Sequence, residues 1–166
     1  MSELQQRLNE LFEYKDGELF WKVDRGAVKC KGKKAGAVNQ GYRIINSAAI
    51  GGYMPVHRVI WVMHNGDAPE CLDHINGNKL DNRIENLRPA TRSQNGFNIT
   101  AMTTNNSGAK NVSWRGDTNK WRVTLMVSGN KMSFGHYDDL ELAELVAHEA
   151  RCKYHGEFAN HGVSNV

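Results

Sequence analysis

The chain has 166 residues, of which 40% are hydrophobic and 23% are charged, and its formal net charge at pH 7 is +3. This length allows one medium core or two small ones, and this composition excludes a disordered chain. The longest apolar run, Val59 to Met63, is too short to cross a bilayer, and the polar N-terminus lacks a signal-peptide core. We therefore expect a soluble cytoplasmic protein.

The first half of the chain alternates short helical and strand patterns. Leucines at helical spacing predict a helix over 4–12, and Asn65-Gly66 is typical of a helix C-terminus. After the first helix, the pattern predicts a strand over 19–23 and an exposed basic loop over 26–36. Strands over 42–46 and 53–56 and a helix over 57–64 follow.

The second half begins with a predicted linker over 99–109 that is rich in Thr, Asn, Ser and Gly. Alternation in 120–127 places Trp121, Val123 and Leu125 on one face of a strand and Arg122 and Thr124 on the other. We predict three antiparallel strands over 111–115, 120–127 and 131–135, packed on a helix over 139–154 whose apolar side includes Leu142, Leu145, Val146 and Ala150.

Charge is unevenly distributed in this half. Residues 105–136 carry five basic side chains against Asp117, whereas residues 137–153 are mainly acidic. A basic sheet beside an acidic helix suits a polyanionic partner such as nucleic acid. On charge alone, a solvated surface without a partner is an equal alternative.

Cysteine and histidine spacing gives no sign of a zinc site. The three cysteines (Cys30, Cys71 and Cys152) are far apart, odd in number and form no C-x-x-C pair. We expect reduced thiols, with Cys71 buried in a strand. We interpret five histidines as surface or core residues without partners at ligand spacing: His64, His136, His148, His155 and His161.

The run from Asp73 to Asn95 has the composition of a hydrolytic site. Asn76-Gly77 permits a tight turn after Asp73 and His74, and Thr91 and Gln94 have capping-box spacing, which places Asn95 inside a helix. A carboxylate and an amide oxygen are hard donors suited to Mg²⁺, and a neutral His74 could act as general base. A structural turn is the alternative for Asp73-His74.

The same run resembles the ββα-metal core of HNH endonucleases of the phage homing type. The resemblance rests on Asp73-His74-Ile75-Asn76-Gly77, Asp81-Asn82, Asn86-Leu87 and Asn95, and on the upstream segments His57-Arg58-Val59-Ile60-Trp61 and Asn65-Gly66. It implies a catalytic pair in which His74 is the general base and Asn86 orients the loop. It also implies that Asp73 and Asn95 bind one divalent ion, Mg²⁺ with Mn²⁺ as the alternative. Asn95 stands where many members carry a second histidine. For His57 we favour packing at the helix start over contact with DNA.

The C-terminal part resembles an AP2 DNA-binding domain. The matching segments are Asn106-Ser107-Gly108, Val112-Ser113-Trp114, Lys120-Trp121, Gly135 and Gly156-Glu157-Phe158-Ala159, and Asn111 stands where a glycine is usual. The resemblance implies that the sheet lies in the major groove and that its outward side chains bind DNA: Lys110, Ser113, Arg115, Arg122, Thr124, Lys131 and Ser133.

We therefore predict an α+β protein with two modules. An HNH nuclease domain spans 1–98, with its ββα-metal core over 57–98 and a β-rich extension over 1–56, and an AP2-like domain with a three-stranded antiparallel sheet plus helix spans 110–166. The predicted function is metal-dependent, site-specific cleavage of double-stranded DNA by a phage homing-type endonuclease. We expect a monomer or weak dimer without a protein partner, located in the host cytoplasm. The alternative is a non-catalytic DNA-binding regulator that keeps the HNH fold.

Overall fold

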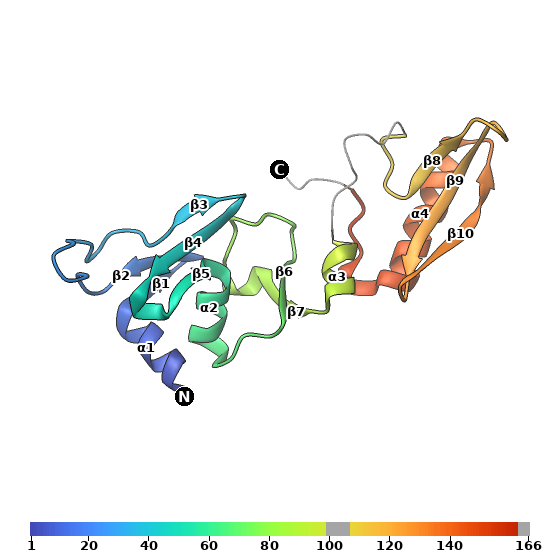
Figure 1. Cartoon of the computed structure of the whole chain (residues 1–166). Coiled ribbons are helices and arrows are strands. Elements are labelled where there is room, and N and C mark those ends of the chain that lie inside the picture. The colour runs from blue at the N-terminus through green and yellow to red at the C-terminus, as the bar shows by residue number, and fades with distance from the viewer. Residues whose placement is uncertain (99–106, 163–166) are drawn as a thin grey trace. The chain divides into compact units, whose positions relative to one another are not determined.

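The computed structural model describes residues 1–98 and 107–162, which form two compact units, Met1–Ala90 and Thr91–Val166 (Figure 1). Both units mix helices with small antiparallel sheets, so the chain has the predicted α+β character. Most of the predicted linker over 99–109 lies outside the described residues. Within the described residues, no helix has the length and apolarity that a membrane span requires.

The first unit is built from short elements around one core. Its antiparallel strands form a β1–β2 hairpin, a β3–β4–β5 sheet and a β6–β7 hairpin, and helices α1 and α2 pack against each other. The element bounds are α1 (Glu3–Leu11), β1 (Phe12–Lys15), β2 (Glu18–Trp21), β3 (Ala37–Asn39), β4 (Tyr42–Ser47), η1 (Ala48–Ile50), β5 (Gly52–Pro55), α2 (Val56–Asn65), β6 (Cys71–His74), η2 (Ile84–Asn86) and β7 (Leu87–Ala90).

Helix α2 is the central element of this core. Val59 and Ile60 are fully buried, as their helical spacing predicts, and His57 is buried with them. The helix ends at Gly66, whose φ of 93° is in the left-handed region and whose N–H donates to the Val62 carbonyl at 2.9 Å. The predicted C-terminus is confirmed, and the helix holds His57 against the rest of the unit.

The β1–β2 hairpin, of which β1 is not predicted from the sequence, supports the loop between β6 and β7. Gly17 has a φ of 80°, and a Cβ built on it would lie 2.7 Å from the backbone nitrogen of Arg83. The Tyr14 hydroxyl accepts a hydrogen bond from the Ile84 N–H at 3.2 Å. The N-terminal extension therefore braces the loop that follows His74.

In the second unit, helix α4 lies along one face of an antiparallel sheet with strand order β10–β9–β8 (Figure 1). The three predicted strands and the helix are confirmed within a few residues. The bounds are α3 (Arg92–Phe97), β8 (Val112–Arg115), β9 (Lys120–Val127), β10 (Asn130–Tyr137), α4 (Leu140–His155) and η3 (Gly156–Phe158).

The predicted apolar side of α4 is wrong in part. Leu142 and Leu145 are 48% and 58% exposed, and the helix instead faces the sheet with three buried alanines: Ala143, Ala147 and Ala150. Small side chains at these positions let the helix backbone approach the strands closely, whereas leucines would hold it away. The core of this unit therefore comes mainly from Val112, Val123 and Leu125.

Helix α3 is held by the second unit. The Phe97 ring stacks on the His155 ring, with centroids 3.8 Å apart and planes within 2°. The Lys110 Nζ donates to the Phe97 carbonyl at 2.7 Å, and the Asn160 Nδ2 donates to the Asn98 carbonyl at 2.8 Å. These contacts explain why the division between the units falls after Ala90, eight residues before the predicted end of the nuclease domain.

Candidate active site

The β6–β7 hairpin positions the Asp-His pair. Antiparallel pairing sets Asp73 opposite Arg88 and His74 opposite Leu87, so the two site residues end β6 and the loop over 75–86 follows at once. Asp73 is 3% exposed and His74 is 5% exposed. Both polar side chains are therefore held inside the unit, where their hydrogen bonds decide their chemistry.

Asn86 ties the two ends of this loop together. Its Oδ1 accepts a hydrogen bond from the Asn76 N–H at 3.1 Å, and its Nδ2 donates to the Asn76 Oδ1 at 3.0 Å and to the Asp81 carbonyl at 2.7 Å. The Asn86 carbonyl also accepts from the Ile75 N–H at 2.9 Å. Because Ile75 and Asn76 directly follow His74, these bonds fix the backbone on which the histidine sits.

Asp81 adds a second tie within the loop. Its carboxylate accepts hydrogen bonds from the Arg83 Nε at 2.8 Å and Nη2 at 2.7 Å, and from the Asn76 Nδ2 at 2.8 Å. The hydrogen bond from Arg83 is the main reason that the pKa of Asp81 falls to about 2. Asp81 is therefore ionised at neutral pH and holds the loop in its folded form.

Asn82 sets the tautomer of His74. The Asn82 Nδ2 donates to the Leu80 carbonyl at 3.3 Å, which leaves its Oδ1 facing the His74 Nε2 at 3.1 Å. An amide oxygen only accepts, so Nε2 carries the proton and the lone pair of the neutral imidazole is on Nδ1. Burial is the largest influence on the ring and lowers the pKa of His74, so the neutral form is present at pH 7.

His57 packs on His74. The two rings meet edge to face with centroids 5.1 Å apart, and Tyr42 lies 5.6 Å from His57 and 6.3 Å from His74. Burial, followed by the charge on a protonated His74, lowers the pKa of His57 to about 4. His57 thus packs, as we favoured, but against the site itself. The helical spacing from His57 to Ile60 was the signal that could have placed it on the buried face.

Arg88 is a functional neighbour that sequence reasoning missed. Its Nε and Nη2 donate to the Asp73 Oδ2 at 2.9 and 2.7 Å, in a pair whose side chains are 13% and 4% exposed. The contact depends on the register of two strands fifteen residues apart, which no local pattern specifies. This ion pair holds the Asp73 carboxylate in a defined position.

The proposed amide ligand, Asn95, lies on α3. The predicted capping box is confirmed: the Gln94 N–H donates to the Thr91 Oγ1 at 3.2 Å, and the Thr91 N–H donates to the Gln94 Oε1 at 2.8 Å. The helix belongs to the second unit. The role of Asn95 toward a metal bound by Asp73 stays a prediction.

Six of the seven predicted DNA contacts share the sheet face opposite α4. Directly paired residues lie on the same face, and the register pairs Ser113 with Arg122 and Thr124 with Ser133. This outer face consists of Ser113, Arg115, Lys120, Arg122, Thr124, Met126, Lys131, Ser133 and His136. Lys110 does not belong to it. Its amine is half-buried on the Phe97 carbonyl, and burial lowers its pKa to about 8.

His136 joins the outer face because of a β-bulge. The register shifts between Ser133 and Gly135, so His136 pairs with Arg122 instead of falling on the helix side. Among the described residues, the Arg122 Nε is buried and has no hydrogen-bond partner. The bulge therefore places His136 beside Arg122 on the outer face.

One more prediction about the histidines is wrong. His148 and His161 do have partners at ligand spacing, because His148 and Cys152 are four residues apart on α4 and the chain returns His161 to the same place. The helical spacing of His148 and Cys152 was visible in the sequence. The approach of His161 was not, because it depends on the fold after α4.

A protein-family match and two viral proteins show what this chain is similar to. The HNH endonuclease family matches residues 54–97, which include α2, the β6–β7 hairpin and its loop. "Protein 3.8" of Escherichia phage T7 is 34% identical over 105 residues, which are 62% of this chain and 86% of that protein. "Uncharacterized HNH endonuclease L560" of Acanthamoeba polyphaga mimivirus is 31% identical over 111 residues, which are 65% of this chain and 57% of that protein. No solved structure matches the chain.

Proposed function

Because the chain belongs to the HNH endonuclease family, we propose that it is a metal-dependent, site-specific endonuclease that hydrolyses phosphodiester bonds in double-stranded DNA. The observation that carries the proposal is the state of His74. A buried, neutral imidazole whose Nε2–H is held by Asn82 presents the lone pair of Nδ1 as a base. The family match covers this residue and its loop.

In the proposed reaction, the His74 Nδ1 takes a proton from a water molecule as that water attacks the phosphorus atom. The bond from phosphorus to the 3′ oxygen breaks, and that oxygen takes a proton from solvent, which leaves a 5′-phosphate and a 3′-hydroxyl. Protonation of Nδ1 gives an imidazolium whose Nε2–H still donates to the Asn82 oxygen. The Asp73 carboxylate favours this charged form, since it raises the pKa of His74 against the effect of burial.

The residues fit a hard divalent ion. A buried carboxylate held in place by Arg88, together with an amide oxygen, is the oxygen-donor set that Mg²⁺ prefers. We propose that Asp73 and Asn95 hold this ion, with Mn²⁺ as the alternative. When bound, it would neutralise charge on the phosphate and on the leaving oxygen. Asn86 acts as a positioning residue for His74 through the loop.

We propose that the second unit is an AP2-like reader of DNA. Support comes from the outer face, where Arg122 and Lys131 lie among short hydroxyl side chains that can contact phosphates and base edges. Asn111 has a φ of 71°, a conformation that glycine adopts readily and that asparagine tolerates. With such a reader, the enzyme would be a phage homing-type endonuclease that acts as a monomer or weak dimer in the host cytoplasm.

A plasmid assay with Mg²⁺ tests the proposal. We expect the wild-type chain to convert supercoiled plasmid to nicked or linear forms, and His74→Ala to reduce this rate by on the order of a hundred-fold or more. His64→Ala is the matched control, because His64 is an exposed residue of α2 whose Nδ1 contacts the carbonyl of Ile60 in the same helix and whose ring packs on Tyr14.

Ligation of the product ends provides the chemical readout. Direct ligation without kinase treatment is expected for a 5′-phosphate. If wild type and His74→Ala convert plasmid equally, the nuclease proposal fails, and a DNA-binding regulator that keeps the HNH fold takes its place.

A further inference from the structure

Three metal-ligating side chains meet in the second unit. The Cys152 Sγ lies 3.7 Å from the His148 Nδ1 and 4.0 Å from the His161 Nε2. The rings of His148 and His161 stack with centroids 4.1 Å apart and planes at 26°. All three residues are exposed, and their ligand atoms lie within 4.8 Å of one another. An ion from solution can therefore reach them.

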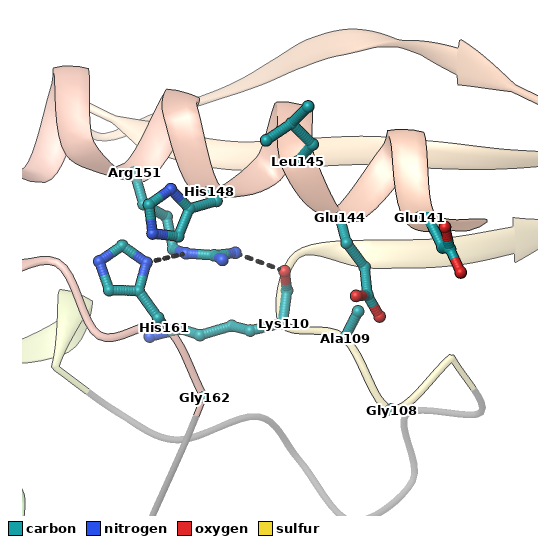
Figure 2. Close-up of a pocket in the computed structure, with 10 residues that line it drawn as sticks. All are labelled: Gly108, Ala109, Lys110, Glu141, Glu144, Leu145, His148, Arg151, His161 and Gly162. Atoms are coloured by element: carbon teal, nitrogen blue, oxygen red, sulfur yellow. Dashed lines mark hydrogen bonds between the residues drawn. The ribbon is translucent and has the colours of Figure 1, made fainter. Parts of the chain in front are cut away.

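The fold brings these residues together in two steps. His148 and Cys152 are four apart on α4, which places them on one face of the helix. After η3 the chain runs back along α4, anchored by the buried Phe158 and by the hydrogen bond from Asn160 to the Asn98 carbonyl. Figure 2 shows the His161 ring facing the His148 ring, with Arg151 beside them.

The spacing fits a tetrahedral site. Zinc bonds of about 2.0 Å to nitrogen and about 2.3 Å to sulfur place neighbouring nitrogen and sulfur ligands about 3.6 Å apart. The two sulfur–nitrogen distances exceed this value by only a few tenths of an ångström. Small side-chain rotations would bring all three ligand atoms around one ion.

The donor set selects a different metal from the proposed nuclease site. Two imidazoles and a thiolate are the ligands of Zn²⁺ and related transition metals, whereas Mg²⁺ prefers oxygen. A fourth position can be taken by water, because His148 and His161 line an open pocket of about 480 Å³ (Figure 2). That pocket is lined by Glu141 and Glu144 and also by Lys110 and Arg151.

One contact must change when a metal binds. The Arg151 Nε donates to the His161 Nδ1 at 3.3 Å, but an imidazole that binds a metal through Nε2 carries its proton on Nδ1. This long hydrogen bond would therefore break. Arg151 keeps its position, since its Nη1 still donates to the Lys110 carbonyl at 2.7 Å and to the Asn111 Oδ1 at 3.4 Å. Its positive charge then lies beside the thiolate that a metal needs from Cys152.

We propose that His148, Cys152 and His161 form a second metal site, which takes Zn²⁺ and ties the segment after η3 to α4. We assign this site no part in DNA cleavage, because it lies apart in sequence and chemistry from the Asp73-His74 pair. Its consequence is local: the ion fixes His161, the neighbour of Asn160, and Asn160 in turn binds the end of α3.

Titration of the full, reduced chain with Co²⁺ tests the site, because cobalt replaces zinc and reports its ligands by absorption. We expect one Co²⁺ per chain to give a thiolate-to-cobalt charge-transfer band and the strong visible bands of tetrahedral cobalt, both removed by added Zn²⁺. Cys152→Ser should abolish the charge-transfer band. His148→Gln and His161→Gln should each weaken Co²⁺ binding at least about ten-fold. Loss of a residue that only supports a metal ligand already costs about that much affinity, and loss of a ligand itself should cost no less.

Two controls keep the assignment specific. Cys71→Ser removes another thiol, and His136→Gln removes an exposed histidine of the outer face, so both should bind Co²⁺ as wild type does. As a second readout, Zn²⁺ should raise the melting temperature of the wild type but not that of Cys152→Ser. A spectrum without a thiolate band, or a band that survives Cys152→Ser, overturns the proposal.

Discussion

At the scale of single residues, burial keeps the two histidines of the site neutral. His57 and His74 lie edge to face inside the first unit, and burial is the first cause of the lowered pKa of each. A neutral His74 is what a general base requires, and a neutral His57 adds no positive charge beside it. In the proposed mechanism, His57 therefore contributes by remaining uncharged beside His74.

This arrangement predicts acid sensitivity of the fold. The pKa of His57 is about 4 in the folded chain, below its ordinary value of 6.5, so the unfolded chain binds a proton first as pH falls. The stability that neutral His57 contributes is fully present above pH 6.5 and is lost as the pH falls from 6.5 to 4. From pH 7 to pH 5 we expect the free energy of unfolding to drop by about 2 kcal/mol through this residue. Urea unfolding at the two pH values measures the drop.

His57→Gln serves as the comparison for that experiment. Glutamine keeps a polar side chain of similar length but does not titrate, so the difference between pH 7 and pH 5 should shrink by most of the roughly 2 kcal/mol expected from His57. An equal difference in the variant would show that His57 is not the titrating group.

At the scale of elements, the β6–β7 register creates a buried ion pair, Asp73 with Arg88, close to an exposed one, Asp81 with Arg83. Removing Arg88 takes two hydrogen bonds from a carboxylate that is 3% exposed. We expect Arg88→Met to lower the free energy of unfolding by about 3 kcal/mol. Arg83→Met, at a side chain that is 46% exposed, should have a much smaller effect. Urea unfolding of the two variants in parallel measures both effects. An equal loss of unfolding free energy in the two variants would contradict the prediction.

The bulge in β10 decides which side chains form the outer face. Gly135 has a φ of 119°, and a Cβ built there would lie 2.7 Å from the Tyr137 hydroxyl. That hydroxyl donates to the Phe134 carbonyl at 2.7 Å, so it is not free to move away. Side chains before and after the bulge, such as Ser133 and His136, can therefore share a face although three positions separate them.

We predict that Gly135→Ala destabilises the second unit by about 1–3 kcal/mol, through backbone strain and the clash with Tyr137. Gly116→Ala is the matched control, since Gly116 lies in the turn between β8 and β9 with open space around it and no positive φ. Thermal unfolding compares the two. Equal destabilisation by Gly116→Ala would mean that the bulge has no special role.

Local patterns were enough to predict much of this architecture, and contacts between distant segments were not. The Thr91 capping box, the Gly66 helix end and the alternation of β9 each depend on a few neighbouring residues. The pairing of Arg88 with Asp73 depends on strand register, and the return of His161 to α4 depends on the anchoring of the C-terminal segment. The sheet face on which His136 lies depends on a bulge, because the register shift moves every later side chain of β10 to the opposite face.

At the scale of the whole molecule, the proposed general base His74 lies in the first unit, and the outer face proposed to bind DNA lies in the second. Cleavage chemistry and binding should then respond to different substitutions. Arg122→Ala should weaken DNA binding and reduce the slope of log affinity against log salt by about one unit for each phosphate that the guanidinium neutralises.

Lys153→Ala, on the helix side of the sheet, is the control of equal charge change and should leave the slope as in the wild type. Fluorescence anisotropy with a DNA duplex over a series of salt concentrations provides the measurement. A slope unchanged by Arg122→Ala would remove the outer face from DNA binding.

The central claim is that His74 acts as a neutral general base, and the pH dependence of single-turnover cleavage at saturating Mg²⁺ tests it most directly. We predict a rate that is constant near pH 7 and falls about ten-fold per pH unit once the pH is below the pKa of His74, which burial holds under 6.5. His74→Ala should be slower by on the order of a hundred-fold or more and lack this step, while its DNA affinity stays at the wild-type value. Equal rates and equal pH profiles in wild type and His74→Ala would contradict this role for His74.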